Sequence, residues 1–143
     1  MQGLWENPFR VAAVYVATNA LIMLVLGMLV VRARVATRTE IGDGGSPAMQ
    51  GPLRAHGNNT ENVPLPLLMM LFICSLGGPV LLIHAVGAPL TLGRIAHAVG
   101  LTQSVGVSIP RFIGMTLTWI AFIVGVAACL WLALMPPATS GIE

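Results

Sequence analysis

Residues 62–93 read NVPLPLLMMLFICSLGGPVLLIHAVGAPLTLG, a stretch that contains no Asp, Glu, Lys or Arg. It is too long for one membrane crossing of ordinary tilt, because about 20 apolar residues already span the hydrocarbon core. Gly77, Gly78 and Pro79 lie inside it, and a Gly-Gly-Pro triplet is typical of a helix end followed by a turn. The sequence therefore predicts two helices here, joined by a tight hairpin.

Two further uncharged stretches flank this region. Residues 11–31 are followed by Arg32 and Arg34, and an apolar run of that length with basic residues after it is not typical of a cleaved secretory signal. Residues 112–135 are followed by two prolines, which end a helix. We therefore predict one all-α membrane domain over residues 1–143, a bundle of four transmembrane helices at about 9–34, 47–76, 80–100 and 110–135, with a polar loop at about 35–46.

The composition supports a membrane protein and excludes several other classes. Hydrophobic residues make up 56% of the chain and charged residues only 8%, against about 25% charged in soluble domains. A net charge of +2 gives no basic field for nucleic acid, so DNA or RNA binding is not expected. Cys74 and Cys129 lie in apolar runs without a His or Cys at ligand spacing, so we expect packing roles and no metal site.

The arginines are distributed unequally between the two sides of the predicted bundle. Four crossings place the first and third loops on one side, and Arg10 lies on the other. Cytoplasmic loops of membrane proteins carry an excess of basic residues, so these two loops are predicted to be cytoplasmic and both termini to lie on the opposite side. The arginines on the side of the first and third loops are Arg32, Arg34, Arg38, Arg54, Arg94 and Arg111.

The second predicted helix carries a polar stripe at its end nearest the first loop. Arg54, Asn58 and Glu61 are spaced four and three residues apart, so they share one helix face. An ionisable group at membrane depth costs about 2.5 to 3.5 kcal/mol on insertion scales, so it tends to serve a binding site. A structural role remains open, in which Arg54 and Glu61 pair with neighbouring helices. His97 lies three residues after Arg94 on one face, and for it too both roles remain open.

The stripe carries a resemblance to a known family. Residues 41–45, IGDGG, and residues 54–65, RAHGNNTENVPL, resemble the second-helix signature of the MAPEG family, the membrane-associated proteins in eicosanoid and glutathione metabolism. The signature is Arg, three residues, Asn, two residues and Glu. Residues 93–101, GRIAHAVGL, are similar to the end of the third helix in the bacterial branch of the family. The resemblance spans nearly the whole chain and implies a multi-pass protein of the bacterial inner membrane.

The resemblance implies a homotrimer in the lipid bilayer. It also implies that glutathione binds as a cosubstrate between neighbouring subunits, near the cytoplasmic side. It makes Arg94 the residue that holds a ligand carboxylate and Arg111 the residue that stabilises the thiolate. It also implies a basic contact from the first helix, for which Arg34 and Arg38 both remain possible. The further implied contacts to glutathione are Arg54, Asn58, Glu61 and His97.

The chain departs from the family pattern at several positions. Asn59 and Asn62 stand where members commonly have aromatic residues, and His97 and Leu101 stand where some eukaryotic members have Tyr. The side chains that provide stacking and hydroxyl contacts to the ligand in those members are therefore replaced here.

Residue chemistry independently supports a thiolate mechanism at Arg111. A free thiol has a pKa of about 8.5, and lowering it by two units requires about 2.7 kcal/mol of extra stabilisation of the anion. Arg111 follows Pro110 at the predicted start of a helix, where a guanidinium and the helix dipole both favour an anion. The thiolate would attack a lipophilic electrophile that arrives from the membrane. The structural alternative for Arg111 is an interface anchor.

Three functions follow from these observations. The first is a microsomal-type glutathione S-transferase or peroxidase acting on lipophilic electrophiles. The second is a MAPEG-type protein that binds lipid or glutathione without turnover. The third is a small four-helix exporter, against which Glu61 argues, because it lies at the helix mouth beside Arg54 and not alone at mid-depth.

Overall fold

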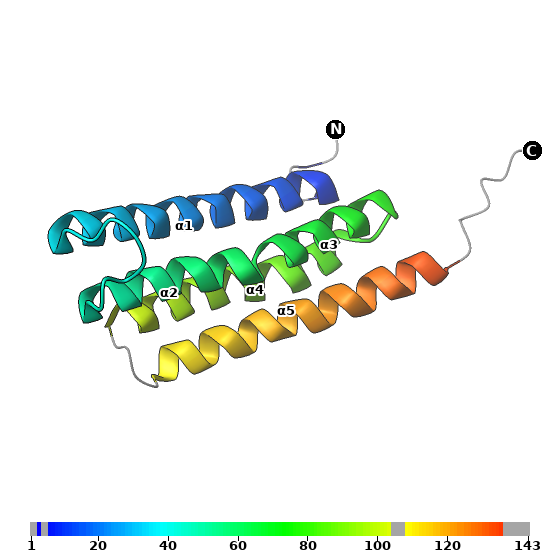
Figure 1. Ribbon diagram of the computed structural model, residues 1–143. Coiled ribbons are helices and arrows are strands. Elements are labelled where there is room, and N and C mark those ends of the chain that lie inside the picture. The colour runs from blue at the N-terminus through cyan, green and yellow to red at the C-terminus, as the bar shows by residue number, and fades with distance from the viewer. Residues whose placement is uncertain (1–2, 4–5, 104–107, 136–143) are drawn as a thin grey trace, which may run out of the picture.

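The computed structural model describes residues 3, 6–103 and 108–135, without the side chains of residues 102 and 103. Every regular element in that part of the chain is an α-helix. Helices α2 and α3 follow each other nearly end to end, so the chain forms a bundle of long rods with α4 beside them (Figure 1). The helices are α1 (Pro8–Thr37), α2 (Pro47–Asn62), α3 (Pro64–Ser75), α4 (Val80–Gln103) and α5 (Ile109–Leu134).

Three of these helices are long and apolar enough to cross a membrane. They comprise Pro8–Thr37, Val80–Leu101 and Ile109–Leu134, with 30, 22 and 26 residues. The chain is therefore a multi-pass membrane protein. Helix α3 has 12 residues, a length of about 18 Å at 1.5 Å per residue, which is less than the hydrocarbon core of about 30 Å. It reaches further only in continuation with α2.

The segment predicted as one helix over 47–76 consists of two helices. Helix α2 ends at Asn62 and α3 begins at Pro64, because proline has no backbone N–H to donate to the preceding turn. Val63, between them, keeps a helical backbone, with φ −88° and ψ −42°, and its N–H donates to the Asn59 carbonyl at 3.1 Å. The path of the chain therefore bends at Val63 without leaving the bundle.

The hairpin after α3 falls at the predicted Gly-Gly-Pro triplet. Gly77 has a φ of +76°, which favours glycine. A Cβ atom on Gly78 would lie 2.5 Å from Ile73 Cγ2 and 2.8 Å from the Ile73 carbonyl oxygen. Neither position accepts a larger residue without a shift of the backbone.

Helices α4 and α5 pack closely through glycine. A Cβ atom on Gly93 would lie 2.7 Å from the Gly114 carbonyl oxygen, and one on Gly114 would lie 2.6 Å from the Gly93 carbonyl oxygen. The small-residue pair Ala121 and Gly125 also faces inward, where a Cβ atom on Gly125 would lie 2.8 Å from Met69 Cε. Direct backbone contact at Gly93 brings the polar residues that follow it in α4 against α5.

A layer of buried polar side chains separates two apolar clusters along the bundle axis. The cluster nearer the 77–79 hairpin includes Ile73, Ile83 and Leu90, and the other includes Leu26, Ala55 and Leu101. A polar layer at this depth must satisfy its own hydrogen bonds, because lipid offers none. Its members are Asn19, Asn59, Thr91, Arg94, His97 and Thr118.

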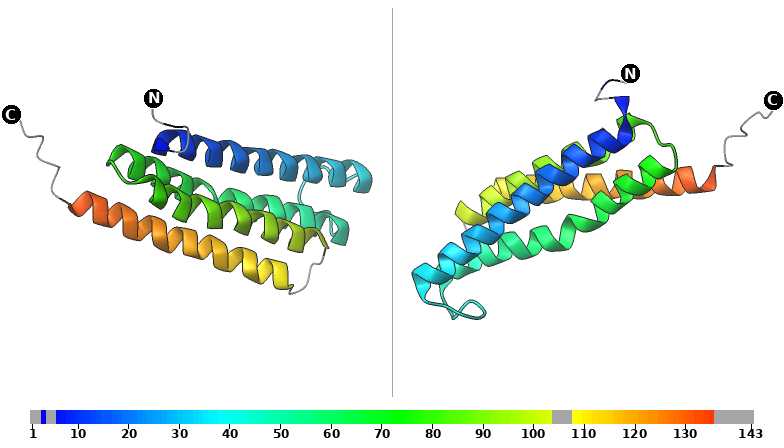
Figure 2. Two further views of the ribbon diagram at one scale, coloured as in Figure 1. Left: turned by 180° about the vertical axis from the view of Figure 1, so that it is seen from behind. Right: turned by 90° about the horizontal axis from the view of Figure 1, so that it is seen from above.

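The two ends of the bundle differ in their polar residues. The end of α1, the start of α2, the end of α4 and the start of α5 all lie together (Figures 1 and 2). We name this end of the bundle the loop end. The arginines near the end of α1 and those of α2, α4 and α5 lie toward it. The first residues of α1 and the last of α5 lie at the opposite end.

Candidate functional site

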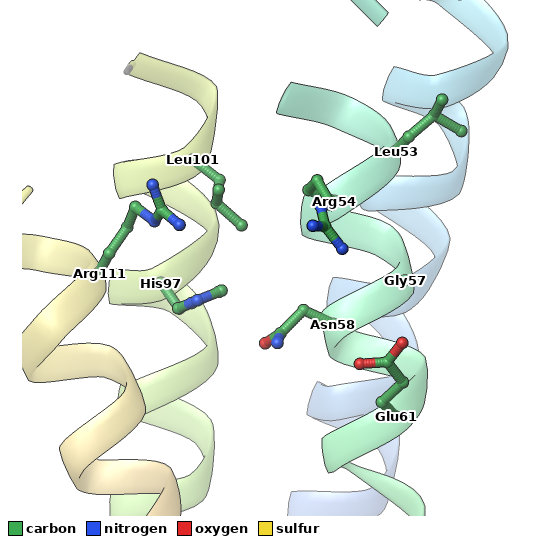
Figure 3. Close-up of a pocket in the computed structure, with 8 residues that line it drawn as sticks. All are labelled: Leu53, Arg54, Gly57, Asn58, Glu61, His97, Leu101 and Arg111. Atoms are coloured by element: carbon green, nitrogen blue, oxygen red, sulfur yellow. The ribbon is translucent and has the colours of Figure 1, made fainter. Parts of the chain in front are cut away.

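A cavity of about 360 Å³ opens among α2, α4 and α5 at the loop end. It adjoins a second hollow of about 540 Å³, which also reaches Asp43 of the α1–α2 loop. Both volumes fall in the range of small-molecule sites. The first cavity is lined by Leu53, Arg54, Gly57, Asn58, Glu61, His97, Leu101 and Arg111 (Figure 3).

Helix α2 provides the charged wall of the cavity. Arg54, Asn58 and Glu61 project from one face of the helix toward α4 and α5 (Figure 3). Arg54 and Glu61 are exposed and Asn58 is half-buried. The spacing of four and three residues therefore places a cation, an amide and an anion along one wall.

His97 of α4 lies on the opposite wall and is 4% exposed. Its Nδ1 atom lies 3.2 Å from Nη2 of Arg94. A guanidinium only donates hydrogen bonds, so Nδ1 must accept and the neutral ring carries its proton on Nε2. His97 thus offers an N–H donor to the cavity.

Arg111 lines the cavity from the first turn of α5, where it is half-buried. Its stem lies across Gly100 of α4: a Cβ atom on Gly100 would lie 2.6 Å from Arg111 Cγ and 2.9 Å from Arg111 N. The first backbone N–H groups of a helix have no partner in their own helix, and the helix dipole is positive there. A guanidinium at this position adds to a local preference for an anion.

Arg94 is buried behind the cavity, with 1% of its surface exposed. Its Nη2 donates to Asn58 Oδ1 at 2.7 Å, and its Nε donates to Asn59 Oδ1 at 3.3 Å. On the α5 side, Nη1 lies 3.4 Å from Thr118 Oγ1 and 3.9 Å from Met115 Sδ. The guanidinium therefore orients the protein's own side chains, two of which, Asn58 and His97, line the cavity.

The sequence comparisons agree with this architecture. The sequence model of the MAPEG family matches residues 12–131. The chain belongs to the MAPEG family. It is 35% identical over 121 residues to the inner membrane protein YecN of Escherichia coli K12, which covers 85% of this chain and 91% of YecN. The same values hold for YecN of Escherichia coli O6:H1. No solved structure matches the chain significantly.

The structure gives a physical reason for one departure from the MAPEG pattern. Asn59, which stands where members commonly have an aromatic residue, is 0% exposed and accepts from the buried Arg94 guanidinium at 3.3 Å. A buried charge is costly unless polar groups surround it, and an aromatic side chain offers no comparable acceptor. Asn62, the second position where an aromatic residue is replaced, donates from Nδ2 to the Asn58 carbonyl of its own helix at 2.9 Å.

Arg34 and Arg38 lie apart from the cavity within one chain. Arg34 Nη1 donates to the carbonyl oxygens of Thr39, Glu40 and Gly42 at 3.3, 3.0 and 3.3 Å. Arg38 is the C-cap of α1 and has a φ of 54°. Both residues line a separate shallow hollow at the end of α1. In this MAPEG chain Arg34 holds the α1–α2 loop.

We expect Arg34→Ala to loosen that loop, because three carbonyl oxygens lose one shared charged donor, a loss of about 1 kcal/mol. Cleavage after Glu40 by a glutamate-specific protease should become several-fold faster. Arg32→Ala, which removes an exposed arginine of the same helix, is the matched control. Equal cleavage rates for the two variants would show that Arg34 does not hold the loop.

Sequence reasoning missed two lining residues, Leu53 and Gly57. Gly57 carries the clearest signal, because it lies between Arg54 and Glu61 on α2, and a Cβ atom there would meet no other atom within 4 Å. A glycine inside a polar helical stripe keeps space open beside the charged groups. Leu53 carries no polar group, and only the packing of α2 against α4 shows its position.

Proposed function

We propose that this MAPEG protein binds glutathione, or a similar low-molecular-weight thiol, and transfers it as a thiolate to lipophilic electrophiles. The observation that carries the proposal is the meeting of Arg54, Asn58, Glu61, His97 and Arg111 in one cavity formed by three helices. Guanidinium groups from α2 and α5 share this cavity, and Arg94 lies one side chain behind it. This arrangement suits a small anion that contains sulfur.

The charges of the cavity complement those of glutathione, which has one ammonium, two carboxylates and a thiol. In our proposal Glu61 receives the ammonium and Arg54 a carboxylate. Asn58 Oδ1 is occupied by Arg94, so Asn58 offers its Nδ2 donor to the tripeptide. His97 offers its Nε2–H to the sulfur or to the second carboxylate.

The chemical role of Arg111 is to stabilise the thiolate. The proton leaves the thiol for solvent, because a guanidinium keeps its charge at neutral pH and is not a base. The sulfur lone pair then forms a carbon–sulfur bond with the electrophile, and the leaving group departs with the electrons of the bond that breaks. Arg111 needs to stabilise the anion by about 2.7 kcal/mol to lower a thiol pKa by two units.

The membrane arrangement is part of the proposal. We infer that α2 and α3 together form the fourth crossing, that the loop end faces the cytoplasm of a bacterial inner membrane, and that the electrophile enters from the bilayer. A homotrimer, which the family resemblance implies, fits the exposure of Arg54 and Glu61 at the cavity mouth, since a neighbouring subunit could cover them. The basic residues at this end support the orientation.

A second candidate is a MAPEG protein that binds the thiol or a lipid without turnover. It is favoured by the position of Arg94, whose hydrogen bonds go to the protein's own side chains. This leaves the cavity with fewer cationic contacts than the resemblance implies. Binding alone requires no activation of the sulfur.

The test compares glutathione binding with turnover in detergent-solubilised protein. Calorimetry measures binding, and the release of product from a chlorodinitrobenzene-type electrophile measures conjugation. Binding with conjugation supports the transferase, whereas binding without conjugation or peroxide reduction supports the binding protein. Proton-coupled export of a dye from proteoliposomes, without thiol dependence, would contradict both the transferase and the binding protein and would support an exporter.

We expect Gly100→Ala to weaken thiol binding about 10-fold, a loss near 1.4 kcal/mol. The added Cβ would lie 2.6 Å from Arg111 Cγ and 2.9 Å from Arg111 N, so the start of α5 must move. Calorimetry with glutathione measures the effect. Gly27→Ala is the control, because its Cβ would meet His56 Nε2 at an ordinary 3.6 Å. An unchanged glutathione affinity in Gly100→Ala would show that the position of Arg111 does not affect thiol binding.

A further inference from the structure

Two polar atoms in the middle of the bundle have no partner among the residues that the structure describes. They are Oδ1 of Asn19 in α1 and Nδ2 of Asn59 in α2. The two side chains are 1% and 0% exposed, so bulk solvent does not reach them. A buried polar group without a hydrogen bond costs about 1 to 3 kcal/mol.

The chemical identity of each atom follows from its neighbours. Asn19 Nδ2 donates to the Tyr15 carbonyl oxygen at 2.9 Å, and that oxygen can only accept. Asn59 Oδ1 accepts from Arg94 Nε at 3.3 Å, and that nitrogen can only donate. Rotating either side-chain amide by 180° would place two acceptors against each other at Asn19 and two donors against each other at Asn59. The unpaired atom of Asn19 is therefore an acceptor, and that of Asn59 is a donor.

The two amides approach neighbouring positions on α4. Asn19 Nδ2 also donates to Thr91 Oγ1 at 2.8 Å, and Arg94, the partner of Asn59, follows Thr91 by three residues. Residues three apart on a helix lie about 5 to 6 Å from each other. Asn19 and Asn59 therefore approach the same stretch of α4, from α1 and α2 respectively.

We propose that one water molecule is bound among α1, α2 and α4, between Asn19 and Asn59. It accepts from Asn59 Nδ2–H and donates to Asn19 Oδ1. The Thr91 hydroxyl, which accepts from Asn19, has its own proton to donate to the same water. Three hydrogen bonds are typical of a buried water.

The water completes a chain of hydrogen bonds that all point away from a buried cation. Arg94 donates to Asn59, Asn59 to the water, the water to Asn19, and Asn19 to the Tyr15 carbonyl. Bonds aligned in one direction polarise one another and strengthen. The chain runs from Arg94 toward the half of the bundle that holds the Tyr15–His84 hydrogen bond of 2.9 Å. The inference does not depend on the proposed function.

The test is an experimental structure of the full chain at a resolution that shows ordered water. A solvent peak within hydrogen-bonding distance of Asn19 Oδ1 and Asn59 Nδ2 is expected. Asn19→Leu should lose this peak and lower the Tm by roughly 5 °C, because Asn59 Nδ2 is then left unpaired. Ala20→Leu, at an exposed neighbouring position of α1, is the control and should keep both.

Two results would overturn the inference. The first is a native map without the peak, including one in which the two amides bond each other directly. The second is an Asn19→Leu protein with a Tm no lower than that of Ala20→Leu. If Asn19→Leu does not fold, the native map alone decides.

Discussion

Arg111→Ala should lower kcat/KM for glutathione conjugation by about 100-fold, the typical effect of removing one group that stabilises an anion in an active site. Arg111 lies at the first turn of α5 and lines the cavity opposite Arg54. Without its guanidinium the bound thiol remains protonated at neutral pH. The loss should appear in both kcat and glutathione affinity, because Arg111 lines the cavity as well as stabilising the anion.

The direct measurement is the ultraviolet absorbance of the thiolate after glutathione is added to the solubilised protein. The native protein should show the band and Arg111→Ala should not, while Arg111→Lys should keep part of it. Arg10→Ala removes an exposed arginine at the opposite end of α1 and should match the native protein. A full thiolate band in Arg111→Ala would assign Arg111 to the membrane interface.

Arg94→Met should lower the stability of the bundle by about 3 kcal/mol in the absence of any thiol, because it leaves the buried Asn59 oxygen and the half-buried Asn58 oxygen without their donor. Met replaces the length of the arginine stem, so the expected loss arises from hydrogen bonds and not from a void. In a thermal unfolding experiment the Tm should fall by roughly 10 °C.

The matched control is Arg32→Met, at an exposed position of α1. Glutathione affinity should also fall in Arg94→Met, because Asn58 and His97 lose the group that orients them. If the Tm without thiol were unchanged and only the affinity fell, Arg94 would act on the ligand itself, as the family resemblance implies. Stability without ligand therefore separates the two roles.

Features set by helix periodicity and turn chemistry could be predicted from the sequence. The spacing of Arg54, Asn58 and Glu61 fixes a common face whatever α2 packs against, and the structure places all three in one cavity. The turn at Gly77 follows from the conformational freedom of glycine. Both depend on neighbours within a few residues along the chain.

The environment of Arg94 could not be predicted, because its partners come from α2 and α5 as well as its own helix. No local pattern indicates that Asn59 and Thr118 will accept from its guanidinium, since this depends on how closely α4 and α5 approach at Gly93 and Gly114. The hydrogen bonds of Arg34 could not be predicted either, because its acceptors are backbone carbonyl oxygens, which every residue has.

The hydrogen bonds from Arg94 also limit how this protein can evolve. They join residues 35 and 36 positions apart in the chain, so a substitution at position 58 or 59 changes the fitness of the residue at position 94. Contacting residues of one network show non-additive effects. An aromatic residue at position 59 would remove an acceptor from the Arg94 guanidinium, so its effect on stability should depend on the residue at position 94.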